Sequence, residues 1–170
     1  MFINRSRMPV SLAMGVFLAL WALGTTTSLA ESDSRQIEGS WMGRLTPANL
    51  PFSFPFLITF IPKGGLVASG LPYVRDTSFG NILGTAGHGE WKYVGHLEFQ
   101  INFVSLLQGA PDNENPGMEL GTDNFSLRVE LDTEGIVLNG DFEDVVKNLD
   151  GEVVFTTTGT YYATRIRAEP

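Results

Sequence analysis

The feature that most constrains this chain is a succession of β-type segments that begins at Gly39-Ser40-Trp41 and ends around Arg165, with no convincing helix between them. About eight such segments follow one another, and most are joined by short turns. An antiparallel sheet with strands in this order can close on itself by pairing its last strand with its first. We therefore predict an all-β fold, an eight-stranded antiparallel up-and-down barrel, lipocalin-like, over residues 38–167.

Alternation of apolar and polar residues defines the individual strands. In residues 97–103 the apolar side chains alternate with Glu98, Gln100 and Asn102, so one face is apolar and the other is wet. This pattern is typical of an antiparallel sheet that covers a core. A second strand with the same pattern is predicted from Phe125 to Leu131. Residues 70–89 and 108–117 are predicted to be long surface loops, which often carry function.

The first 30 residues are predicted to be a secretory signal peptide. Arg5 and Arg7 give a basic start, an apolar run follows from Val10, and Ser28 and Ala30 form a small-x-small cleavage site. An uncleaved membrane anchor is the alternative, but the apolar run is short for a bilayer, which takes roughly 20 residues. We expect cleavage near Ala30, a polar lead over residues 31–37, a periplasmic or secreted bacterial location, and no integral membrane association afterwards.

Composition excludes several classes of function. The chain has no cysteine, which rules out cysteine nucleophiles, zinc thiolate sites and cysteine-ligated iron–sulfur clusters, and suits an exported bacterial protein better than an exported eukaryotic one. Without Arg5 and Arg7, nine basic residues face 19 acidic ones, for a net charge near −10. Nucleic acid is therefore not an expected partner, because it needs clustered Lys and Arg.

Three short motifs carry a resemblance to known families. Gly39-x-Trp41 resembles the first-strand motif of the lipocalin and wider calycin group, in which the indole packs against an Arg near the end of the barrel. Arg165 stands in the matching place. The segment from Thr85 to Trp91, and the closing Gly-Thr-x-x-x-Thr-Arg pattern that ends at Arg165, are similar to segments of small exported bacterial proteins of unassigned role.

Two departures refine this resemblance. Lipocalins carry a helix after the eighth strand and usually have disulfides, whereas here only Ala168-Glu169-Pro170 follows Arg167 and no cysteine occurs. The resemblance is therefore to a calycin-like or allene-oxide-cyclase-like barrel rather than to lipocalins proper. It implies that Trp41 and Arg165 stack at one end of the barrel, with Arg165 either closing that end or binding an anion in the interior.

His88 and Glu90 are the candidate catalytic residues, although the sequence identifies none firmly. They stand two apart in a glycine-flanked segment, so both can project to one side of a strand start and act as an acid–base pair. Gly87 and Gly89 can equally indicate a tight bend in which His88 binds backbone. Two histidines without cysteine match no zinc spacing, and nothing beyond a single His supports haem, so we predict no metal and no cofactor.

The many aromatic residues predict how the barrel is lined. Twelve phenylalanines are present, most of them in predicted strands, and an eight-stranded barrel either is filled by side chains or holds one small ligand. The predicted ligand-binding residues are Trp41, Phe60, Phe99, Phe103, Phe125 and Arg165. Three functions remain open: binding of a small apolar or amphipathic molecule, a cyclase or isomerase that uses His88, Glu90 and Arg165, and a filled barrel that serves as a structural or interaction module.

Overall fold

The computed structural model of the chain describes residues 36–70, 73–77 and 79–167, the segment 73–77 by its backbone alone. The predicted signal peptide lies outside the described residues, as does most of the polar lead. Within these ranges the chain forms strands β1 (Gly39–Pro47), β2 (Phe54–Phe60), β3 (Gly65–Ser69), β4 (Tyr73–Thr77), β5 (Gly80–Gly84), β6 (Gly87–Gly95), β7 (Glu98–Gly109), β8 (Glu119–Leu131), β9 (Val137–Asn148) and β10 (Val153–Arg165). A single 3-10 turn, η1 (Pro62–Gly64), joins β2 to β3.

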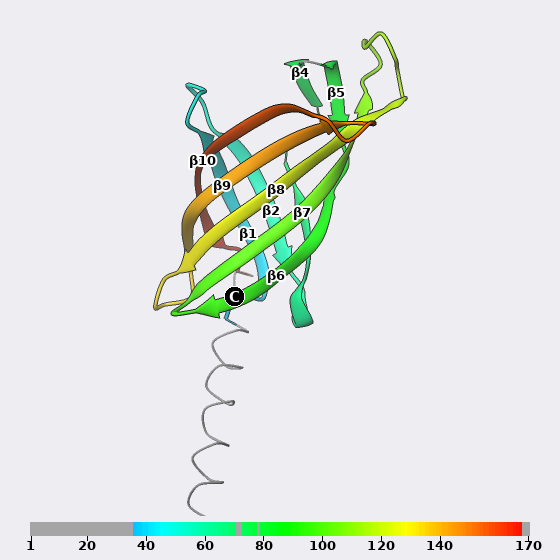
Figure 1. Cartoon of the computed structure of the whole chain (residues 1–170). Coiled ribbons are helices and arrows are strands. Elements are labelled where there is room, and N and C mark those ends of the chain that lie inside the picture. The colour runs from blue at the N-terminus through cyan, green and yellow to red at the C-terminus, as the bar shows by residue number, and fades with distance from the viewer. Residues whose placement is uncertain (1–35, 71–72, 78, 168–170) are drawn as a thin grey trace, which may run out of the picture. The chain divides into compact units, whose positions relative to one another are not determined.

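Eight of these strands close into the predicted antiparallel barrel. Each is hydrogen-bonded to its sequence neighbour in the order β1-β2-β3-β6-β7-β8-β9-β10, and β10 pairs back onto β1. The strands coil steeply around the barrel, as the ribbon of Figure 1 shows. The seam aligns Trp41 with Arg165 and Leu45 with Tyr161, so the first and last strands meet along their length. The all-β class and the up-and-down topology predicted from the sequence are thereby confirmed.

The segment predicted as the longest loop, residues 70–89, differs from the prediction because it contains two further strands. β4 and β5 form a hairpin, and β5 pairs with the last residues of β7, where Ile82 lies opposite Gly109. β6 then begins at Gly87 and pairs with the remainder of β7. Both strands therefore use the same edge of β7, and the β4–β5 hairpin extends beyond one end of the barrel (Figure 1).

Glycines on two inward faces make room for aromatic rings. A Cβ on Gly87 would lie 2.6 Å from the ring of Phe103, and one on Gly159 would lie 2.7 Å from the ring of Phe142. Both distances are shorter than any ordinary carbon contact. The glycine-flanked segment around His88 is thus a strand packed against Phe103, and the alternative of a tight bend is wrong.

The two ends of the barrel differ in their connections. One end carries the β2–β3, β6–β7 and β8–β9 turns together with the start of β1 and the finish of β10, and we call it the plugged end. The other carries the β1–β2, β7–β8 and β9–β10 connections and the β4–β5 hairpin, and we call it the loop end (Figure 1). In the described part of the chain, no helix is long and apolar enough to span a membrane.

Candidate functional site

The plugged end is sealed by Trp41 and Arg165, as the resemblance implied. The Arg165 guanidinium carbon lies 4.4 Å from the centre of the indole, a cation–π geometry. The same guanidinium donates to the backbone carbonyls of Gly135 at 2.7 Å and Glu38 at 2.6 Å, and also to that of Gln36. Every nitrogen of the group thereby donates to a backbone carbonyl of the segment before β1 or of the β8–β9 turn. Arg165 performs the closing role, and its role as an anion ligand stays a prediction.

Other polar groups at this end are also satisfied. The indole nitrogen of Trp41, whose side chain is 0% exposed, donates to the carbonyl of Ile37 at 2.9 Å. Ile37 is itself fully buried, so the end of the predicted polar lead belongs to the core. The Asp132 carboxylate accepts from the backbone N–H groups of Ile136 and Val137, and the bond from Val137 is the main cause that lowers the pKa of Asp132.

An aromatic layer crosses the interior above this plug, toward the loop end. Phe103 and Phe125 stack with ring centres 4.9 Å apart, and Phe56 stacks on Phe103 at 5.6 Å. Phe142 contacts Phe125 at 6.2 Å, and Tyr161 meets Phe56 edge-on at 6.4 Å. These five rings, contributed by β2, β7, β8, β9 and β10, form what we call the aromatic floor. It presents apolar ring surface toward the loop end.

Polar side chains replace the apolar ones one step further toward the loop end. Alternation places Ser105, Asp123, Asp144 and Thr157 on the inward faces of β7, β8, β9 and β10. Register brings them together, because Ser105 lies opposite Asp123 and Asp144 lies opposite Thr157. Asp144 also lies opposite Phe125 of the aromatic floor. We call these four residues the polar belt.

The two carboxyl groups of the belt form a pair with shared electrostatics. Burial is the main cause that raises the pKa of Asp123 to about 9, and its hydrogen bond with Asp144 raises it further. Burial also raises the pKa of Asp144, while the bond from Asp123 opposes that rise. At neutral pH Asp123 therefore keeps its proton and donates a hydrogen bond to Asp144, an arrangement familiar from carboxyl pairs that cannot both ionise in a low-dielectric site.

Three oxygen atoms in this interior are buried without a hydrogen-bond partner in the described part of the chain. They are Oδ1 of Asp123, Oδ1 of Asp144 and the hydroxyl of Tyr161. They come from inward faces of the adjacent strands β8, β9 and β10, and Tyr161 is only 1% exposed. A buried polar atom without a partner costs roughly 1–3 kcal/mol. Native proteins keep few such atoms, and functional sites are among the places where they occur.

The structure divides the six predicted ligand-binding residues between two regions. Trp41, Phe60 and Phe99 are buried in the core nearer the plugged end, where Phe60 and Phe99 each contact Trp91. Arg165 lies at the same end, against Trp41. Phe103 and Phe125 belong to the aromatic floor, directly below the polar belt. Of the predicted set, these two are the ones that adjoin the buried carboxyl pair.

His88 and Glu90 point away from the interior. Both lie in β6 on the face opposite to Gly87, Gly89 and Trp91, and both are exposed. Their assignment to a common side of the strand is correct, but that side is the outer wall of the barrel. A cyclase or isomerase acting inside the barrel would have to draw its acid and base from elsewhere.

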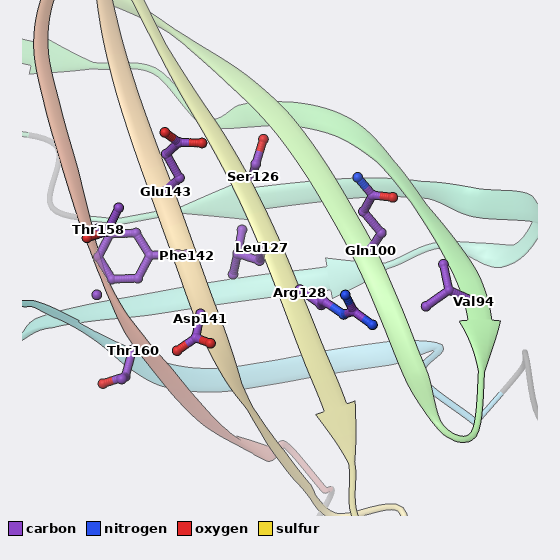
Figure 2. Close-up of a pocket in the computed structure, with 11 residues that line it drawn as sticks. Val94, Gln100, Ser126, Leu127, Arg128, Asp141, Phe142, Glu143, Thr158 and Thr160 are labelled. Carbon is purple, nitrogen blue, oxygen red and sulfur yellow. The ribbon is translucent and has the colours of Figure 1, made fainter.

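The outer wall carries a groove of its own, of about 740 Å³, across β6 to β10. Figure 2 shows its polar side chains, among them Gln100, Ser126, Arg128, Asp141 and Glu143, standing on the outward faces of these strands. Arg128 forms an ion pair with Glu98 at 2.6 Å, yet it is 75% exposed. Water satisfies such groups, and an exposed ion pair contributes little. The polar groups of the groove therefore need no ligand to satisfy them, unlike the unpartnered buried oxygens of the interior.

Sequence analysis missed Asp123 and Asp144, although a usable signal was present. The strand was predicted to begin at Phe125, but the alternation continues two residues back and places Asp123 on the same inward face. Likewise, Phe142 and Asp144 share a face, so the acidic residues at positions 141–144 do not all face solvent. Asp141 and Glu143 point outward, and Asp144 points inward. Extending each pattern to the true ends of the strands would have found the pair.

Comparisons with known proteins add no assignment. No family model matches the chain, and neither a curated protein nor a solved structure is significantly similar to it. The calycin-like interpretation therefore depends on the barrel itself, which is compatible with it. Among the described side chains no group of three or more histidines and acids is placed to hold a metal ion.

Proposed function

We propose that this protein binds a small amphipathic molecule in the half of its barrel nearer the loop end. The apolar body of the ligand lies on the aromatic floor, and its polar head reaches the polar belt. The observation that carries this proposal is the set of three unpartnered buried oxygens on β8, β9 and β10. A ligand with hydrogen-bond donors at that level satisfies atoms that the protein leaves unsatisfied.

The arrangement of the barrel supports this location over the plugged end. Trp41, Ile37 and Arg165 fill the plugged end, and their polar groups are paired with backbone carbonyls. The long connections and the β4–β5 hairpin lie at the loop end, where mobile or adaptable segments commonly govern entry to a barrel. We also propose, from the predicted signal peptide, that binding takes place outside the cytoplasm.

A second candidate function is proton transfer to or from a bound substrate, as in an isomerase or cyclase. The protonated Asp123 beside Asp144 is the observation that favours it, because a carboxylic acid held neutral at pH 7 can donate a proton and a second carboxyl group beside it can exchange one. Asp123 and Asp144 replace His88 and Glu90 in that role. Turnover would have to disappear in both Asp123→Asn and Asp144→Asn.

The decisive experiment compares two serine variants with wild type. Ser105→Phe places a ring in the interior beside Asp123, whereas Ser126→Phe places the same ring in the outer groove. Binding of a panel of fatty acids, terpenoids and aromatic molecules is followed by tryptophan fluorescence, and native mass spectrometry of the protein from its own host tests for a retained ligand. We expect Ser105→Phe to weaken binding at least tenfold and Ser126→Phe to leave it unchanged.

Three other results would contradict the proposal. If Ser126→Phe alone abolished binding, the ligand would occupy the outer groove. If wild type bound nothing in the panel and carried nothing from its host, the filled-barrel alternative, a structural or interaction module, would replace it. If both variants bound like wild type, the ligand would lie in neither place. Thermal melts of both variants separate a local block from loss of the fold.

A further inference from the structure

We propose that the polar head of the ligand is a positively charged amine, bound at the carboxyl pair formed by Asp123 and Asp144. This inference rests on the proposed function and names the chemical class of the molecule that the barrel holds. It is argued from the acceptors, the charges and the ring surfaces that surround the pair.

Among the side chains that the structure describes, no basic group is paired with the two carboxyls. Among the inward side chains that the structure describes, the basic one is Arg165, and it is bound to three carbonyls at the plugged end. Arg44, Lys92 and Arg128 stand on outward faces, and the inward positions that flank the pair on β7 and β10 are Ser105 and Thr157, with Tyr161 further along β10. The pair thus faces uncharged side chains on both flanking strands.

The unpartnered atoms of the pair are acceptors. Oδ1 of Asp123 and Oδ1 of Asp144 can each accept a hydrogen bond that the protein does not supply, and the buried hydroxyl of Tyr161, lower in the aromatic floor on the neighbouring strand, is a third unpartnered oxygen that can accept or donate. An ammonium group offers three N–H donors and a positive charge, whereas a hydroxyl offers one donor and no charge. A carboxylate head would bring only further acceptors to a site that already lacks donors. The site therefore selects for a cationic head.

The surroundings of the pair favour a cation in two further ways. The aromatic floor lies directly below and makes this level of the barrel apolar, which strengthens the attraction between a carboxyl pair and an ammonium group. Asp144 lies opposite Phe125, one of those rings. In addition, the chain carries 19 acidic and 11 basic residues, and a net negative protein raises the encounter rate of cationic ligands.

Calorimetric titration with three probes that share one ring tests the inference on the wild-type protein. The probes are 2-phenylethylamine, 2-phenylethanol and 3-phenylpropanoate, at pH 7. We expect the amine to bind at least tenfold more tightly than the alcohol, and the carboxylate to bind most weakly. This comparison needs no variant and does not depend on the stability of any mutant.

A matched pair of variants then tests which residue causes the preference for the amine over the alcohol. Asp144→Asn removes the inward carboxylate, and Asp141→Asn makes the same change three residues away on the outward face of the same strand. In Asp144→Asn the amine-to-alcohol preference is expected to fall below about threefold while alcohol binding persists. In Asp141→Asn the preference is expected to remain at the wild-type value.

The outcomes separate this inference from the proposed function. If the alcohol and the amine bind wild type equally, or if the carboxylate binds best, the cationic head is wrong while the interior site stands. If the preference survives in Asp144→Asn, or disappears in Asp141→Asn, the carboxyl pair is not its origin. If none of the three probes displaces or mimics a ligand of the interior, and none from the wider panel binds, the proposed function itself fails.

Discussion

The two ends of this barrel differ in whether their buried polar groups have hydrogen-bond partners. At the plugged end every polar group described above has a partner: Arg165 donates to three carbonyls, Trp41 donates to Ile37, and the pKa of Asp132 is lowered by backbone N–H groups. At the loop end the pKa of Asp123 is raised and three buried oxygens lack partners. The contrast indicates that stability is concentrated at one end and that the other end is left incomplete for a ligand.

The largest expected effect is that of removing the plug. Trp41→Ala should lower the free energy of unfolding by about 3–5 kcal/mol, as is usual for truncation of a fully buried Trp. That is a large share of the roughly 5–15 kcal/mol that stabilises a domain. Urea melts at pH 7 measure it. A loss below about 1 kcal/mol would mean that the plugged end does not hold the barrel together.

The second prediction concerns how stability changes with pH. The pKa of Asp123 is about 9 in the folded protein and near 3.8 when the chain is unfolded, so the folded state binds the extra proton between these values. Its contribution to stability is complete below the unfolded value and is lost as pH rises through the folded one. Between pH 5 and pH 9 the free energy of unfolding should fall by a few kcal/mol.

Two aspartate variants sharpen this prediction. Asp123→Asn should flatten the dependence and leave the protein more stable than wild type at pH 9, because the amide never ionises. Asp141→Asn, on the exposed face of β9, should retain the wild-type slope. Chemical melts across the pH range compare the three proteins. Equal slopes in all three would show that the buried pair does not carry the proton.

The third prediction tests the contact between Arg165 and Trp41. Arg165→Ala should cost less than Trp41→Ala, and the double variant should lose less than the two single losses together. Contacting residues couple by about 0.5–3 kcal/mol, and the stacked geometry places this pair within that range. Strict additivity in a double-mutant cycle would mean that the stacking contributes nothing, and that Arg165 acts through its carbonyl bonds alone.

The smallest expected effect belongs to the outer wall. His88→Ala and Glu90→Ala should each change the free energy of unfolding by about 0.5 kcal/mol or less, since both side chains are exposed. Neither should alter the affinity for any probe bound in the interior. A tenfold loss of probe affinity in either variant would relocate the site to the outside of β6.

The barrel could be predicted from the sequence more completely than the site, for a physical reason. Alternation, the Gly39-x-Trp41 motif and Arg165 all describe burial, which repeats along every strand, so strand order and closure followed from them. The β4–β5 hairpin was hidden because residues 70–89 are rich in glycine and lack a clear alternating pattern. The carboxyl pair could not be predicted because the inward direction of its side chains depends on how far β8 and β9 extend. The protonation of Asp123 also depends on Asp144, which lies 21 positions away in the sequence.

The pairing of β1 with β10 also affects the order and the rate of folding. The bond from Arg165 to the carbonyl of Glu38 spans 127 residues, so the ends of the domain must find each other across almost all of its length. Contacts of such long range slow folding, because the chain must close a large loop before they are rewarded. During synthesis from the N-terminus, β1 waits with an unpaired edge until β10 has emerged.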